Sequence, residues 1–188
     1  MVYLSLLIAL MATLGGSLSY LANEAPPGTV LFTYRSMVNE PVEEFLAKSD
    51  EDKARLNLLL IDEHLTAAKS LALQNKLTVA GQAAITEEVA SRIQAITEVL
   101  ERLEVQKKHA QGAQIAKTLY QTLENQSQSL ALASTQGSLS VQLALAPIVV
   151  RLRTAQTTVS LLATAAAARA NGIETNITPP ASVSTIQK

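Results

Sequence analysis

The chain has 188 residues, of which 48% are apolar, 3% are aromatic and 16% are charged, and its net charge is −1. This length suits one domain of ordinary size, and a core so poor in aromatic side chains favours packed helices over a sheet. The chain contains no cysteine, which excludes disulfides, thiolate metal sites and cysteine nucleophiles.

Residues 1–23 are expected to act as a transmembrane anchor or a signal segment. Residues 2–21 contain no charged side chain, and as a helix they would extend about 30 Å, the hydrocarbon thickness of a bilayer. An anchor competes with a signal peptide that is cut after Ser19, and with a third interpretation as a buried core helix. Because no Lys or Arg precedes the apolar run, loop charge does not set its orientation.

Residues 24–172 are predicted to form an all-α domain, an antiparallel bundle of four to five helices that follows the N-terminal helix. A short helix is expected over residues 31–47, with a break near Glu40 because Pro41 lacks an amide proton. A long helix should begin after Ser49, which can cap it, and end at Asn75. Its apolar seam repeats every three or four residues: Leu58, Ile61, Leu65, Ala68 and Ala72.

The third helix is predicted to begin near Thr78 and to end at Lys107, Lys108 and His109, with a turn at Gly112. Glu98 and Arg102 have the spacing of an exposed ion pair on one helix. A heptad-like seam predicts roughly antiparallel neighbours that cross at about 20°. That seam consists of Ile85, Val89, Ile93, Ile96, Leu100 and Leu103.

Two further helices are predicted, over residues 113–133 and 138–170, with a loop at residues 134–137 between them. Their seams are Ile115, Leu119, Leu123 and Leu130, and then Leu145, Val149, Leu152, Val159 and Ala166. Pro147 should kink the last helix unless the helix begins there. Residues 173–188, which include two adjacent prolines, are predicted to be a disordered tail.

Charge is distributed unevenly along the chain. Residues 24–104 carry 14 acids and 8 bases, whereas residues 105–188 carry 2 acids and 7 bases. We interpret this as two halves that attract each other when folded. Seven bases spread over 84 residues with one aromatic side chain, Tyr120, argue against a nucleic-acid surface. Residues 110–168 contain only four charges and are either a polar uncharged surface or a protein interface.

No catalytic, cofactor or metal motif is found in the sequence. The chain lacks the Glu-x-x-His pairs of a di-iron bundle, and the adjacent side chains of Asp62, Glu63 and His64 diverge by about 100° per residue on a helix. Glu98, Glu101 and Glu104 have the spacing of a solvated helix face. We therefore predict no catalytic, cofactor-binding or metal-binding residues, and no enzyme activity.

Two segments resemble a known family: residues 27–35 (PGTVLFTYR) and residues 49–56 (SDEDKARL). Over about residues 24–105 the chain resembles the bacterial extracytoplasmic helical domain of unknown function (DUF5667-type), with a membrane segment, a Pro-Gly step, a short amphipathic helix and a capped long helix. Where that family has an Arg-Leu-x-Glu-like step, this chain has residues 64–67 (HLTA). The resemblance implies no catalytic residues, and it implies kinship with outer parts of anti-sigma-like regulators.

These patterns predict a non-catalytic extracytoplasmic helical domain at the cell membrane, attached through residues 2–21. It would serve as a structural or protein-interaction module that binds a protein partner or itself. A variant of this prediction is the outer part of a transmembrane regulator, which would need a cytoplasmic part before Met1. The alternative is a secreted or periplasmic chaperone-like protein that binds a metal ion or small ligand, with His64 and nearby acids converging with residues of another helix.

Overall fold

The computed structural model describes residues 40–172, and every regular element in that part is an α-helix. The helices are α3 (Glu40–Leu46), α4 (Asp50–Leu73), α5 (Val79–Val105), α6 (His109–Gln136) and α7 (Leu139–Ala170). The predicted all-α class is confirmed. The predicted anchor or signal segment (1–23), the first nine residues of the predicted short helix (31–39) and the predicted tail (173–188) lie outside the described residues.

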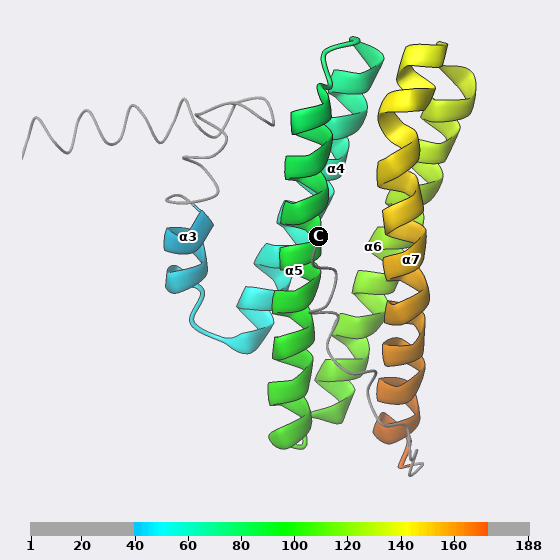
Figure 1. Cartoon of the computed structure of the whole chain (residues 1–188). Helices are drawn as coiled ribbons and strands as arrows, with labels where there is room; N and C mark the ends of the chain where they lie inside the picture. The colour runs from blue at the N-terminus through cyan, green and yellow to red at the C-terminus, as the bar shows by residue number, and fades with distance from the viewer. Residues whose placement is uncertain (1–39, 173–188) are drawn as a thin grey trace, which may run out of the picture.

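Four long helices, α4 to α7, lie side by side as a bundle, and the chain reverses its direction at each of the three connections (Figure 1). Contacts are most extensive within the pairs α6–α7 and α4–α5, and the two pairs also contact each other. The short helix α3 lies beside the bundle and contacts α4. The described part is therefore two helical hairpins packed together, with α3 at one side.

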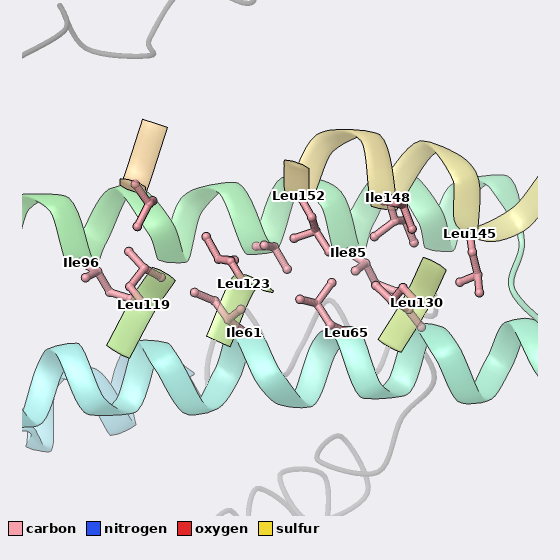
Figure 2. Packing of buried hydrophobic residues seen from close by; sticks show 14 of the residues in the cluster. Ile61, Leu65, Ile85, Ile96, Leu119, Leu123, Leu130, Leu145, Ile148 and Leu152 are labelled. Carbon is pink, nitrogen blue, oxygen red and sulfur yellow. The ribbon is translucent and has the colours of Figure 1, made fainter. Parts of the chain in front are cut away.

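Aliphatic side chains from all four long helices meet along the axis of the bundle (Figure 2). Each predicted seam faces this core, because residues three or four apart share one side of a helix. Fully buried examples are Ile61, Leu65, Ile85, Ile96, Leu119, Leu123, Leu130 and Leu145. Each such side chain contributes about 1.5–3 kcal/mol through removal of its apolar surface from water. Leu59 of α4, by contrast, is 54% exposed and lies outside the core.

The predicted helix starts at Ser49 and Thr78 are confirmed. The Ser49 hydroxyl accepts a hydrogen bond from the Asp52 amide at 3.0 Å, and the Thr78 hydroxyl accepts one from the Gly81 amide at 3.0 Å. Asp50, Glu51 and Asp52 occupy the first turn of α4, where the helix dipole favours negative charge. These local signals are sufficient to fix where both helices begin.

Asn75 and Lys107 end α4 and α5 in the same way. Each has a positive φ, 56° and 59°, just beyond its helix. In both turns the amide of the next residue, Lys76 or Lys108, returns to a carbonyl in the last helical turn, at 2.8 and 2.9 Å respectively. This pattern is the Schellman motif, which satisfies helix-end carbonyls. The predicted stop at Asn75 is confirmed.

The boundaries predicted for the third and fourth helices were wrong in part. The turn between α5 and α6 lies at residues 106–108, so Gly112 is a buried residue inside α6 and not a turn residue. The predicted loop at residues 134–137 is helical as far as Gln136, which leaves a two-residue connection. The reason at the first boundary is the Lys107 turn, which closes α5 five residues before the glycine. The two helices are separate elements and not one bent rod.

Pro147 lies inside α7, which continues on both sides of it. A proline within a helix removes one backbone hydrogen bond, the one that its missing amide would donate to the carbonyl of Leu143. The predicted start of the last helix is confirmed, since Ser138 directly precedes Leu139 as its N-cap residue. Among the helices between residues 40 and 172, none is both long enough and apolar enough to cross a membrane.

Candidate functional site

A polar cluster joins α4 to α5 inside the bundle. The Arg92 guanidinium lies 2.6 Å from a Glu88 carboxylate oxygen and donates a hydrogen bond to the Asn57 side-chain oxygen at 3.3 Å. The Asn57 amide nitrogen donates to the carbonyl of Lys53 at 2.9 Å. Asn57 and Arg92 are buried. This cluster fixes the register of α4 against α5. If one helix shifted along the other, buried polar groups would lose their hydrogen-bond partners.

His64, which the alternative function would use as a ligand, is buried on α4. It occupies the same inward face as Leu65 and Ala68, while Asp62 and Glu63 are exposed. The three consecutive side chains therefore diverge, as expected from helix geometry. Within residues 40–172, no group of three or more His, Cys, Asp or Glu side chains is arranged to hold a metal ion.

Charged side chains from four helices meet at the end of the bundle where α4 begins. Arg102 does not pair with Glu98 as predicted: its Nε donates to Asp50 across the helix pair at 2.8 Å. Glu104 lies 3.1 Å from His109 Nδ1 and 3.5 Å from Arg169 Nε. The Glu104–Arg169 pair joins the acidic and basic halves of the chain, consistent with the predicted attraction between them.

The cluster affects the titration of the Asp50 carboxylate. The hydrogen bond from Arg102 is the main cause that lowers the pKa of Asp50 below its ordinary value, aided by the charge of Arg102 and a hydrogen bond from Gln106. Partial burial opposes this effect. Glu98 and Glu101 remain exposed, as predicted for a solvated face. The cluster fastens one end of the bundle, which is a structural role.

Sequence reasoning missed the roles of Asn57 and Arg92. Both stand on the inward faces of their helices, three or four residues from buried apolar positions. A polar side chain within an apolar seam is the signal that could have found them. Their pairing needed the structure, because the two residues are 35 positions apart and meet only through the register of α4 against α5.

The long helices differ strongly in charge. By their sequences, α4 and α5 together carry ten acids and five bases, whereas α7 carries three Arg residues and no acid. On α6 the charged side chains are Lys117 and Glu124. The weakly charged stretch noted in the sequence, residues 110–168, is thus the hairpin of α6 and α7, and it forms one side of the bundle (Figure 1).

The outer face of α7 exposes a line of large apolar side chains, Leu139, Leu143, Val150 and Leu161, each 58–70% exposed. At 100° per residue, their positions fall within about 40° of one another around the helix. They extend over 22 residues, or about 33 Å. We call these four residues the α7 outer stripe. Because α7 also buries Leu145, Ile148 and Leu152 on its other side, it is apolar on two faces.

The outward side of α6 is polar but uncharged over most of its length. Its exposed positions include Gln111, Gln114, Gln121, Asn125 and Gln128. A hollow of about 420 Å³ lies between α6 and α7, lined by Glu124, Gln128 and Arg153 among others. Depletion of charge and the presence of exposed aliphatic side chains are the features of the central part of a protein interface. The arrangement suits contact with another macromolecule.

No protein-family model, curated protein or solved structure matches the chain. The resemblance to the DUF5667-type domain therefore stays a prediction, and the function must be inferred from the residues themselves.

Proposed function

We propose that this protein is a non-catalytic antiparallel helical bundle that acts as a protein-interaction module, held outside the cytoplasmic membrane by its N-terminal segment. The observation that carries the proposal is the α7 outer stripe. Single exposed leucines are common on soluble proteins, but four large aliphatic side chains aligned on one face of a helix indicate an interaction surface. A partner that covered them would remove their apolar surface from water.

The neighbouring surface supports the same proposal. Leu132 of α6 is 56% exposed, and it lines the hollow beside α7. Few charges would need to be desolvated on α6 and α7, since these two helices have two and three charged side chains. Desolvation of charge is one of the costs that oppose burial of a surface, and this cost is smallest on this side of the bundle.

The interaction is tested by placing a photo-crosslinking amino acid at Leu143 in the full chain and irradiating intact cells. The matched control is Leu59, an exposed leucine on α4. We expect a discrete adduct from position 143 and none from position 59. Equal adducts from both positions, or none from position 143, would show that the outer side of α7 is not an interaction surface.

Attachment to the membrane is a separate part of the proposal, supported by the uncharged residues 2–21. The measurement is the intact mass of the protein recovered from membrane and soluble extracytoplasmic fractions. A species of 20.0 kDa in the membrane fraction agrees with an anchored domain, which fits a structural module or the outer part of a transmembrane regulator. A soluble species that lacks the first 19 or so residues would replace the anchor with a cleaved signal peptide.

A further inference from the structure

We propose that α3 of a second copy of this chain covers the α7 outer stripe. This inference rests on the proposed function and names the partner of the same surface. It starts from the sequence of α7, in which two exposed arginines, Arg151 and Arg153, closely follow Val150 of the stripe. A suitable occupant is therefore apolar on one side and carries acids.

A second α7 does not meet this requirement. The stripe is centred near Val150, so a symmetric pair of α7 helices would bring Arg151 and Arg153 of both copies to the same place. Because α7 contains no Asp or Glu, the four guanidinium groups would have no carboxylate from either helix beside them. Like charges placed together across an interface oppose association.

The helix α3 has both required properties. Its seven residues (EPVEEFL) contain three acids and no base. Val42, Phe45 and Leu46 are all exposed, and at 86% Phe45 is the most exposed large apolar side chain in the described part of the chain. Their spacing of three and four residues places them on one side of the helix. This apolar side with adjacent acids is complementary to an apolar stripe with adjacent arginines.

The lengths also agree. Seven helical residues extend about 10 Å, the distance covered by α7 from Leu143 to Val150. An α3 helix that lay along this part of the stripe would end beside Arg151 and Arg153, where Glu43, which is exposed, could approach them. The apolar pair Phe45 and Leu46 would then replace water over this part of the stripe.

The occupant must come from another copy. In its own chain α3 contacts α4 among the described helices, and Figure 1 shows it on the opposite side of the bundle from α7. Each copy has one α3 and one outer stripe, so each copy can both provide an occupant and receive one. Because the two surfaces lie on opposite sides of the bundle, the copies join head to tail, each α3 on the outer stripe of the next copy.

The test uses the absence of cysteine, because any cysteine introduced into the full chain is unique. Two differently tagged copies are co-expressed, one with Phe45→Cys and the other with Val150→Cys, and cross-linked with a short bis-maleimide. The control pairs Phe45→Cys with Leu59→Cys, whose exposure is similar to that of Val150. We expect a cross-linked dimer that contains both tags for the first pair and not for the control.

Charge reversal makes the test specific. Arg151→Glu together with Arg153→Glu should reduce the 45–150 cross-link by about tenfold, and Glu43→Lys in the other copy should restore part of it. All three positions are exposed, so unchanged circular dichroism would confirm that the variants fold. Loss without any restoration would contradict the paired charges and overturn the proposal.

The remaining outcomes separate the two proposals. A 150–150 cross-link without a 45–150 cross-link would overturn the α3–α7 contact in favour of a symmetric α7 contact. An intrachain link in a copy with both cysteines would place its own α3 on α7 and also overturn it. Absence of the 45–150 cross-link, with a photo-adduct from position 143 to a different protein, would overturn the α3–α7 contact but retain the proposed function. Absence of both products would overturn both.

Discussion

At the scale of single residues, the most unusual feature is a buried guanidinium in a core built almost wholly from aliphatic side chains. Glu88, on the same helix α5, compensates the charge of Arg92. Asn57 of α4 accepts a hydrogen bond from its guanidinium group. Burying an ion pair has a desolvation cost that often cancels the attraction, but removing one partner alone is costly. This cluster therefore specifies register more than it adds stability.

That distinction can be measured with a double-mutant cycle. Glu88→Leu alone should lower the free energy of unfolding by about 3 kcal/mol, because it removes the carboxylate that compensates Arg92. Adding Arg92→Met should recover most of that loss, since an apolar pair then fills the same space. Urea unfolding followed by circular dichroism gives each value. If the two losses simply add, Glu88 and Arg92 are not coupled.

The Asp50–Arg102 pair predicts a stability difference that depends on pH. The pKa of Asp50 is lowered in the folded protein, so its contribution is present above the pKa of an unfolded Asp and is lost as pH falls through the folded value. Asp50→Asn should therefore cost about 0.5–1 kcal/mol near neutral pH and nothing in strong acid. Unfolding in urea at several pH values tests this, and a constant difference at every pH would contradict it.

At the scale of elements, two glycines differ in the space that surrounds them, so substitution by alanine should have opposite effects at the two positions. A Cβ at Gly137 would lie 2.7 Å from the Cβ and Cγ1 of Val141 and 2.8 Å from the carbonyl oxygen of Ala133, in the two-residue connection between α6 and α7. At Gly112, inside α6, the nearest atom would be a Leu100 methyl at 4.0 Å. The first position has no room for a methyl group, and the second does.

Gly137→Ala should therefore destabilise the bundle by about 1–3 kcal/mol, because α7 or the end of α6 must shift. Gly112→Ala should stabilise it by about 0.5–1 kcal/mol, because glycine inside a helix has excess conformational freedom in the unfolded chain. Thermal and urea unfolding of the two variants provide the comparison. The same sign of effect at both positions would contradict this account of the α6–α7 connection.

The predictability of the elements follows from how local their signals are. The caps at Ser49 and Thr78 and the apolar seams depend on residues within one or two turns, and these predictions were confirmed. The predicted end of α5 was wrong because Lys107 has a positive φ of 59°, a left-handed conformation that is uncommon for lysine and that its residue type does not predict. The sequence identified residues 110–168 as weakly charged, but their place on one side of the bundle depends on tertiary packing.

At the scale of the whole molecule, the bundle has two chemically different sides. The hairpin of α4 and α5 is rich in acids and contributes to every ion pair described above, and the hairpin of α6 and α7 is poor in charge and exposes aliphatic side chains. Three of the exposed leucines, Leu139, Leu143 and Leu161, lie on α7 away from the core. If the N-terminal segment is an anchor, partners would share the membrane surface, where weak contacts form more readily than in dilute solution.

The three short connections between the long helices also determine how the chain can reach this structure. Residues 74–78, 106–108 and 137–138 each join helices that pack directly on each other, so many native contacts form between residues close in sequence. Topologies of this kind close small loops and reach the folded state within about microseconds to milliseconds. A hairpin of α6 and α7 could thus assemble early, with its aliphatic outer stripe already displayed before the acidic hairpin has docked.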